Sequence, residues 1–351
     1  MKILHLAAGN RWTGAAAPAF AEVEALRAAG VDAHYAYVGG YKLQAKLAHH
    51  DFAHPLIEKS QDPLAFARTV EKLDRIISHH GFDVLHAHLT HDHWLARMVI
   101  RGRPIVLART FHSRRVLRRD PFTRLLLRRT QLRFVINDAF HEALSGAIFT
   151  PPPLDHRQFH PDGPAIPLEP PIVTVIGKLS KGRGFEDALR AFAILRNSVA
   201  ARLMIIGHGE HRPVLEELAH SLGIAEHVIW AGYHEDDLAE HYRASSLLLF
   251  TARGSDEGHR AILEAMACGV PPATFPIEGV HALIDPEHIA ASSTPEALAA
   301  TAAALLARGS MNEAMAARSQ QFGYARAAER LMDAYERSVD PEPTAPDHTR
   351  R

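Results

Sequence analysis

The sequence predicts two doubly wound α/β domains, each built around a parallel β-sheet. Short apolar runs alternate with segments of helical periodicity along most of the 351 residues. The alternation is interrupted at the prolines of 151–153 and restarts after Pro171. A length of this size also fits two domains of about 100–200 residues each. We therefore expect one domain over 1–153 and a second over 171–323, joined by a Pro-rich linker.

The first domain opens with a strand over 2–8, a loop with two glycines, a helix over 15–29 and a strand over 31–38. Strand, loop, helix and strand in this order begin a doubly wound fold. A later helix begins at Asp62, whose carboxylate can cap its first turn. Three more strands are expected, over 83–88, 104–109 and 132–136.

The second domain repeats the alternation. Its strands are expected over 172–176, 202–206, 227–231, 246–250 and 272–275. Its helices are expected over 184–196, 212–222, 236–243 and 258–268. A last helix over 324–339 has an apolar face at helical spacing, and the polar, Pro-rich tail 340–351 is expected to be disordered.

The composition excludes several classes of protein. With 39 Lys and Arg against 40 Asp and Glu, the net charge of −1 argues against a whole-protein polyanion binder. One cysteine excludes a disulfide framework and a Cys-based zinc site. No apolar run approaches the roughly 18 residues that span a bilayer, and the apolar start is too short for a signal peptide. A cytoplasmic protein is therefore expected.

The most informative segment is 255–271, which follows an apolar strand and opens a helix. A helix start offers free N–H groups and a positive dipole end to a phosphate, and Gly258 would let that phosphate approach. Asp256 and Glu264 lie about 12 Å apart along a helix that rises ~1.5 Å per residue. Two such acids could hold hydroxyl groups at either end of a nucleotide-sugar. Alternatively, they belong to a solvated loop and helix surface.

This segment resembles the retaining glycosyltransferases of the GT-B fold, of the family 4 type. Residues 263–271, LEAMACGVP, are nearly identical to the family's sequence. The family motif has an acid, seven residues and then Glu, which places Asp256 and Glu264 at its two acids. Most members have Glu at the first, and Glu257 is a competing candidate one residue nearer. The resemblance implies two Rossmann-like domains facing each other across a cleft, with the donor on the second and the last helix crossing back to the first.

The Gly-rich turn 177–184 carries Lys178, Lys181 and Arg183. Cations at a strand-to-helix turn can neutralise a diphosphate leaving group. The family pattern here is Gly-Arg-Leu, three residues and then Lys-Gly, so Lys178 and Arg183 keep the two cationic positions with exchanged residue types. The segment ending at Tyr233 also resembles the family, which has the nucleobase nearby.

In the first domain, the resemblance aligns His112 with the family's active-site histidine and Gly14 with the glycine that lets the chain pass close to the diphosphate. A strand-end histidine alone is more often structural. The resemblance thus implies the catalytic residues His112 and Asp256, and the donor-binding residues Gly14, Lys178, Arg183, Tyr233, Glu257, Gly258, His259, Arg260 and Glu264.

The expected activity is that of a retaining hexosyltransferase. It would move a sugar from a nucleotide-sugar to an envelope polysaccharide or glycolipid-type acceptor, and family frequency favours a UDP-sugar first and GDP-mannose second. Protein cations would neutralise the diphosphate, so neither a metal nor another cofactor is expected. A second hypothesis is a metal-dependent hydrolase using His86, His88, His91 and His93, because alternating residues of a strand share a face. A third is a non-catalytic nucleotide-binding protein of the same fold.

Residues 101–133 contain eleven arginines and one acid, Asp120. Apolar residues such as Leu117 and Phe122 are interleaved with them. Such a surface could contact an anionic membrane peripherally, at its inner face, or hold an anionic acceptor. No recognition motif supports nucleic acid as the partner. Alternatively, the stretch is a solvated helix face with snorkelling arginines.

Overall fold

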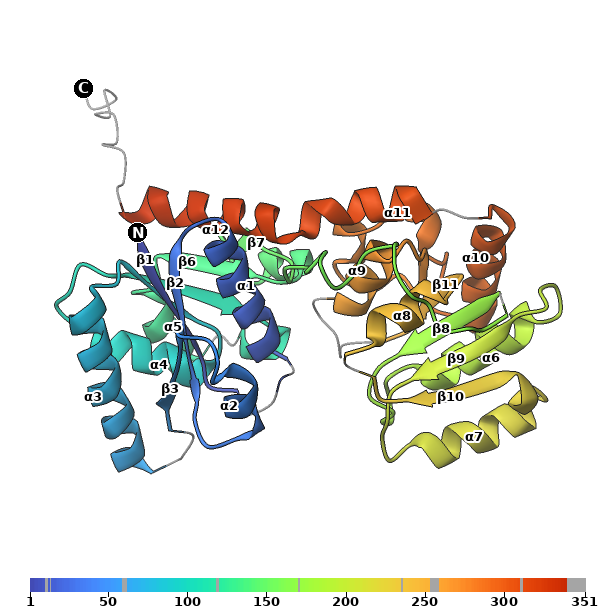
Figure 1. Ribbon diagram of the computed structural model, residues 1–351, viewed down its shortest axis with the longest axis horizontal. Coiled ribbons are helices and arrows are strands. Elements are labelled where there is room, and N and C mark those ends of the chain that lie inside the picture. Colours follow the sequence, from blue (N-terminus) through green and yellow to red (C-terminus); the bar gives the residue numbers. More distant parts are fainter. Residues whose placement is uncertain are drawn as a thin grey trace, which may run out of the picture. The chain divides into compact units, whose positions relative to one another are not determined.

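The computed structural model in Figure 1 confirms the predicted fold class of two Rossmann-like α/β domains. The chain divides into two compact units, one formed by Met1–Pro153 with the helix that begins at Tyr324, and the other by Leu154–Gly323. We call them unit 1 and unit 2 and describe each by itself. The structure describes residues 1–9, 12, 14–58, 62–117, 120–169, 171–234, 236–252, 259–309 and 312–339.

Unit 1 contains a seven-stranded parallel sheet with the order β3-β2-β1-β4-β5-β6-β7. Its strands are β1 (Lys2–Ala7), β2 (Asp32–Val38), β3 (Ala53–Ile57), β4 (Val84–Ala87), β5 (Val106–Phe111), β6 (Leu132–Val135) and β7 (Ile148–Phe149). The chain adds β2 and β3 on one side of β1, and then β4 to β7 on the other. The order therefore reverses between β1 and β4.

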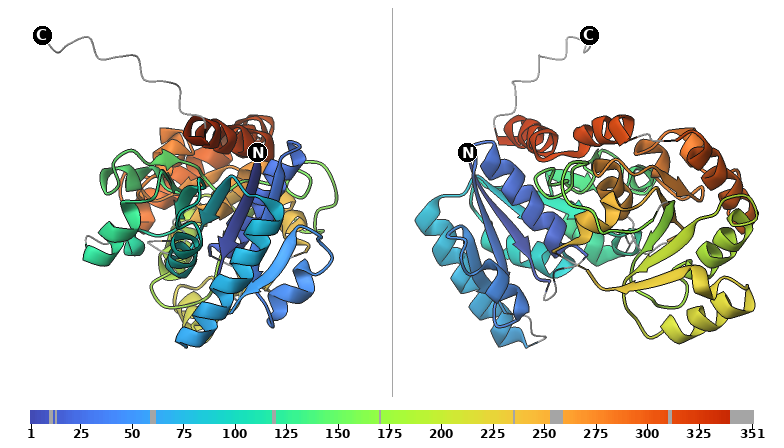
Figure 2. Two further views of the ribbon diagram at one scale, coloured as in Figure 1. Left: turned by 90° about the vertical axis from the view of Figure 1, so that its left-hand side faces the viewer. Right: turned by 45° about the vertical axis from the view of Figure 1, so that its right-hand side comes forward.

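The helices of unit 1 are α1 (Ala16–Ala28), α2 (Lys42–Leu47), α3 (Pro63–His80), α4 (Thr90–Val99), α5 (Pro121–Leu127) and α12 (Tyr324–Val339). Alternate residues of β1 pack into two different cores, which shows how these helices cover the sheet. Ile3 and Ala7 belong to the core formed with α1 and α12, whereas Leu4 and Leu6 belong to the core formed with α3 and α4. Figures 1 and 2 show α12 running beside α1 on one face.

Unit 2 contains a five-stranded parallel sheet with the order β10-β9-β8-β11-β12, so its order reverses between β8 and β11. Its strands are β8 (Ile172–Ile176), β9 (Arg202–Ile206), β10 (Val228–Gly232), β11 (Leu247–Phe250) and β12 (Pro272–Thr274). Its helices are α6 (Phe185–Leu195), α7 (Arg212–Ser221), α8 (Leu238–Arg243), α9 (Arg260–Ala267), α10 (Pro295–Ala307) and α11 (Asn312–Ser319). Side chains of α6, α7 and α10 share one core with alternate residues of β8.

Residues 154–169, which precede β8 and contain no helix, are part of unit 2. Leu154 pairs with Gly323 in an isolated bridge. The Arg243 guanidinium donates hydrogen bonds to the carbonyl oxygens of His160 and Pro164, at 3.2 and 2.6 Å. Within the described residues, no helix has both the length and the apolarity that crossing a bilayer requires.

Candidate functional site: the strand ends of the two sheets

The Gly-rich turn after β8 lies where the strand order of unit 2 reverses, which is where open α/β sheets bind ligands. Its path is fixed by the neighbouring loop after β9. The Leu179 amide donates to the His208 carbonyl at 2.9 Å, and the His211 amide donates to the Leu179 carbonyl at 3.1 Å. A Cβ on Gly209 would lie 2.0 Å from the Leu179 carbonyl oxygen, so only glycine permits this approach.

The predicted donor-binding cations lie on this turn. Lys178 is exposed and Arg183 is half-buried. Tyr233 follows β10 at the same edge of the sheet, with 59% of its surface exposed and its ring 5.3 Å from that of His208. Because the carboxyl ends of parallel strands share one edge, the loops that carry these side chains are neighbours there.

The helix predicted to begin at Gly258 has Arg260 as its first residue, because His259 occupies the N-cap position in the left-handed region, with φ of 50°. Among the described residues, no other non-glycine side chain has a positive φ. Such backbone strain persists only where surrounding contacts impose it. The His259 ring Nε2 donates to the Glu278 carbonyl at 2.9 Å, which anchors this conformation.

Glu264 lies inside α9 with only 4% of its surface exposed. Its Oε1 accepts a hydrogen bond from Arg260 Nε at 2.6 Å, and its Oε2 accepts one from the Tyr242 hydroxyl at 3.2 Å. These contacts orient the carboxylate and hold Arg260 beside it. Asp256, Glu257 and Gly258 lie outside the described residues, so their predicted roles stay predictions.

The two predicted residues of unit 1 lie at the carboxyl edge of its sheet. Gly14, in the loop after β1, has φ of +64° and space around its Cβ position, so backbone conformation rather than packing favours glycine. His112 directly follows β5, and its Nε2 is hydrogen-bonded to Nδ1 of His88 at 2.9 Å. Burial, reinforced by the charge of Arg109, lowers the pKa of His112 to about 3.

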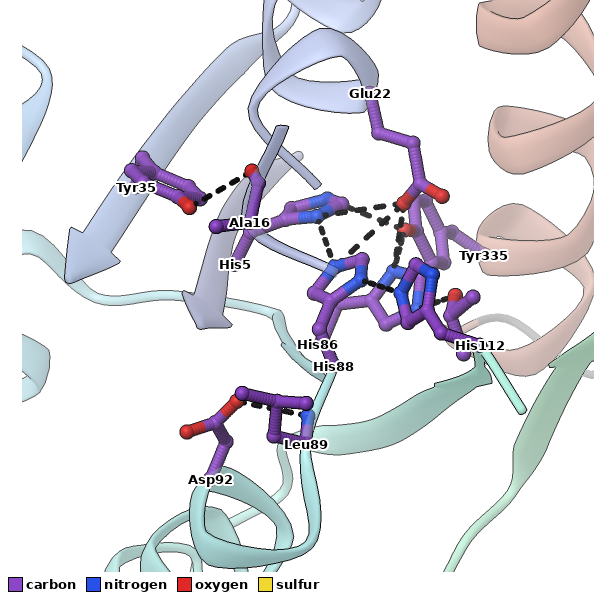
Figure 3. A network of polar contacts seen from close by, with 11 residues as sticks. His5, Ala16, Glu22, Tyr35, His86, His88, Leu89, Asp92, His112 and Tyr335 are labelled. Carbon is purple, nitrogen blue, oxygen red and sulfur yellow. Dashed lines mark hydrogen bonds and ion pairs between the residues drawn. The ribbon is translucent and has the colours of Figure 1, made fainter. Parts of the chain in front are cut away.

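His112 is the outermost member of a chain of buried polar side chains (Figure 3). Nε2 of His88 is hydrogen-bonded to Nδ1 of His5 at 2.9 Å. His86, the register partner of His5 on the adjacent strand, bonds the Tyr335 hydroxyl at 2.6 Å through Nδ1 and Thr110 Oγ1 at 2.7 Å through Nε2. His5 and Tyr335 also belong to this chain, although neither was among the predicted site residues.

Glu22 of α1 points into the same group of imidazoles (Figure 3). Its Oε2 lies 3.6 Å from Nδ1 of His5, 3.6 Å from Nε2 of His88 and 3.8 Å from Nδ1 of His86. Burial raises the pKa of Glu22 well above its ordinary value and lowers that of His5 to about 3. We call His5, Glu22, His86 and His88 the histidine cluster.

The hydrolase hypothesis assigned a different ligand set, and the structure does not assemble it. His91 and His93 are not in the histidine cluster, because the strand ends at Ala87 and both residues belong to α4. Nε2 of His93 is instead hydrogen-bonded to Thr130 Oγ1 at 2.8 Å. The alternation that puts His86 and His88 on one face does not continue into the helix.

Two family models account for most of the sequence. Residues 156–322 match the model described as glycosyl transferases group 1, and residues 12–143 match the model described as glycosyltransferase family 4. The chain belongs to the family 4-type GT-B glycosyltransferases. The two matches fall in unit 2 and unit 1 of this family member, respectively.

Known proteins resemble this GT-B family member to different degrees. The GDP-mannose-dependent alpha-(1-6)-phosphatidylinositol monomannoside mannosyltransferase of Mycolicibacterium smegmatis is 32% identical over 137 residues, which cover 34% of this chain and 36% of that protein. A Rickettsia africae glycosyltransferase has a TM-score of 0.81 at 15% identity, covering 97% of this chain and 99% of that one. Anabaena HepE, solved in complex with UDP, has a TM-score of 0.76 at 16% identity, covering 96% of this chain and all of the other. The first curated relatives are matched over 29–36% of their own length.

Replacing Gly184 by Ala should destabilise the turn between β8 and α6. The new Cβ would lie 2.3 Å from the Thr251 carbonyl oxygen, at a residue with φ of +81°. The matched control is Gly182→Ala, which has φ of +79° but no atom within 4 Å of the Cβ position. In urea unfolding, the control should lower the free energy of unfolding by about 1–2 kcal/mol from backbone strain alone. Gly184→Ala should lower it by about a further 1–3 kcal/mol, and equal losses would contradict the close packing on Thr251.

Proposed function

We propose that this protein transfers a hexose from a nucleotide-sugar donor to an acceptor, with retention of the anomeric configuration. The observation that carries the proposal is the pair of family matches, 12–143 and 156–322, together with a basic turn at the strand reversal of unit 2. The donor's diphosphate would bind at Lys178, Arg183 and the start of α9. These cations would stabilise the departing charge, which is why we propose no metal ion at the diphosphate and no other cofactor.

The remaining site residues take the roles that the family motif gives them. Glu264 would accept hydrogen bonds from ribose hydroxyls, and its fixed orientation between Arg260 and Tyr242 supports a binding role. Asp256 would hold the donor sugar, with Glu257 as the alternative acid, and Tyr233 would lie near the nucleobase. In unit 1, His112 would approach the sugar, and the hydrogen bond between its Nε2 and Nδ1 of His88 would hold its ring in place.

A UDP-sugar is the proposed donor and GDP-mannose the second candidate. Anabaena HepE was solved with UDP, and the Mycolicibacterium smegmatis relative is named as GDP-mannose-dependent. The proposed acceptor is an envelope polysaccharide or glycolipid precursor. The anomeric configuration of the isolated product, read by NMR, tests retention directly.

Lys178→Ala should lower turnover about 10²–10³-fold, because removing one preorganised group that stabilises developing charge raises the barrier by about 2.7–4 kcal/mol. The control is Lys181→Ala, which removes an exposed cation from the same turn. Turnover of the control should stay within about threefold of the original protein. Initial rates with a saturating donor measure both. A loss below threefold in Lys178→Ala would contradict its role at the diphosphate.

UDP should raise the melting temperature more than GDP at equal concentration, because a ligand that binds only the folded state stabilises it by mass action. At one hundred times Kd the stabilisation is about 2.7 kcal/mol. A larger shift with GDP would move the proposal to GDP-mannose. Nucleotide binding without transfer to any acceptor would favour the non-catalytic hypothesis, and the absence of a shift with either nucleotide would contradict donor binding.

The basic stretch offers a surface for an anionic, membrane-bound acceptor. Phe122 and Leu125 of α5 are 71% and 41% exposed, among the arginines of 101–133. We propose peripheral contact of this surface with the inner, cytoplasmic face of an anionic membrane, with apolar insertion and charge acting together.

Vesicles of phosphatidylserine and phosphatidylcholine should therefore sediment more of the protein than phosphatidylcholine alone. Phe122→Ser with Leu125→Ser should reduce this binding at least tenfold, because burying each side chain is worth roughly 1.5–3 kcal/mol. Leu64→Ser is the control, since Leu64 is 68% exposed on α3, outside the basic stretch. Equal binding to both kinds of vesicle would refute the membrane proposal.

A further inference from the structure

The histidine cluster contains a buried carboxylate whose position hydrogen bonding does not explain. Glu22 is 1% exposed, on the face of α1 that packs against the sheet and α12. Among the described residues, its Oε2 has no hydrogen-bond partner. An unpaired polar group in a protein core is costly unless a partner or a cation compensates it. The atoms around Oε2 therefore indicate what compensates it.

Those atoms are three imidazole nitrogens, from His5 of β1, His86 of β4 and His88, which directly follows β4. Each of the four side chains offers one atom, and these four atoms lie within 4.8 Å of one another. A tetrahedral zinc site with bonds of about 2.0–2.2 Å has ligand atoms about 3.4 Å apart. The separations from Glu22 Oε2, at 3.6, 3.6 and 3.8 Å, are close to this value. Ligation would replace two hydrogen bonds, the one between His5 and His88 at 2.9 Å and the one between Nδ1 of His86 and the Tyr335 hydroxyl at 2.6 Å.

The second ring nitrogen of each histidine, which would not bind the metal, is placed as metal ligands require. A metal-bound histidine nearly always bonds its second nitrogen to a fixed partner, which sets its tautomer. His86 meets Thr110 Oγ1 at 2.7 Å through Nε2, and His88 meets His112 at 2.9 Å through Nδ1. For His5, the Tyr335 hydroxyl lies 3.5 Å from Nε2. The nitrogens turned toward Glu22 are Nδ1 of His5, Nδ1 of His86 and Nε2 of His88 (Figure 3).

We propose that the histidine cluster binds one divalent transition-metal ion, zinc being the best match to its donors. The ligands are Nδ1 of His5, Oε2 of Glu22, Nδ1 of His86 and Nε2 of His88. Three imidazoles and one carboxylate suit zinc, and a buried site with four protein ligands is of the structural kind. The ion would join β1, α1 and β4 inside unit 1. It is distinct from the donor diphosphate, at which we propose no metal.

Ligation has a consequence for His112, which rests on the proposed function. A metal on Nε2 of His88 leaves the proton on Nδ1, so that Nδ1 donates to Nε2 of His112. His112 then carries its own proton on Nδ1, the ring atom that has no hydrogen-bond partner among the described residues. His88 is therefore a positioning residue that makes His112 a hydrogen-bond donor.

The test measures metal content, which does not depend on transfer activity. The full chain is produced in zinc-supplemented medium, dialysed without chelator and analysed by mass spectrometry of the elements. One zinc per chain is expected, and cobalt in its place should give the intense visible absorption of tetrahedral Co²⁺. Because the ligands are buried, a second sample is unfolded and refolded with zinc. Less than stoichiometric metal in both samples would overturn the proposal.

Variants locate the ion. Glu22→Gln should reduce bound zinc at least tenfold, and His5→Gln provides a second test if the first variant does not fold. The control is His234→Asn in unit 2, where His234, Asp237 and His241 form another close but partly exposed group. Zinc lost in the control but kept in Glu22→Gln would place the ion elsewhere and refute the proposal. A chain that binds UDP but no zinc would refute this inference and leave the donor proposal intact.

Discussion

Parallel pairing of strands is the constraint from which both halves of the candidate site follow. In a parallel sheet every strand ends at the same edge, so side chains that directly follow different strands gather there. The strand order reverses between β1 and β4 in unit 1, and between β8 and β11 in unit 2. His88 and the loop with Gly14 follow the first pair, and the basic turn follows β8. Within each unit, loops far apart in the sequence therefore become neighbours.

The two units use this edge in opposite ways. Unit 2 keeps Lys178 in solvent, where its charge costs little and can meet an anionic ligand. Unit 1 buries the histidine cluster, and this burial lowers the pKa of its imidazoles and keeps them neutral. A neutral imidazole is one donor and one acceptor, so a chain of them fixes every ring orientation once one end is fixed. Unit 2 thus presents an exposed positive charge, and unit 1 presents imidazole rings in fixed orientations.

Much of the fold could be predicted because buried parallel strands appear as short apolar runs. Asp62 caps α3 as expected, with its carboxylate accepting the Leu64 amide at 3.0 Å. The edge strand β3 was missed, since His54 and Pro55 interrupt its apolar character. So was α4, because Thr90 to His93 look like the end of a strand in a His-rich sequence.

The site could be predicted only where it carries a motif. The turn at Lys178 has one, whereas Glu22 looks like an ordinary solvent-facing residue of a helix. Its spacing from Ala19, Val23 and Leu26 does place it on their buried face, and that spacing could have found it. His5 likewise lies on the same face of β1 as Ile3 and Ala7. What periodicity cannot give is the meeting of α1 with β4, because that contact depends on the order of strands in the sheet.

The return of the chain to unit 1 through α12 has a consequence for synthesis on the ribosome. Most of unit 1 emerges first, but Tyr335, which bonds His86 at 2.6 Å, is made only after all of unit 2. Until α12 has been made, the apolar residues of α1 that pack against it near Leu331 stay uncovered. Domains generally fold in order of emergence, yet here the amino-terminal unit cannot finish first. The core of unit 1 therefore stays incomplete while unit 2 is being translated. Chaperones would be needed most during this period.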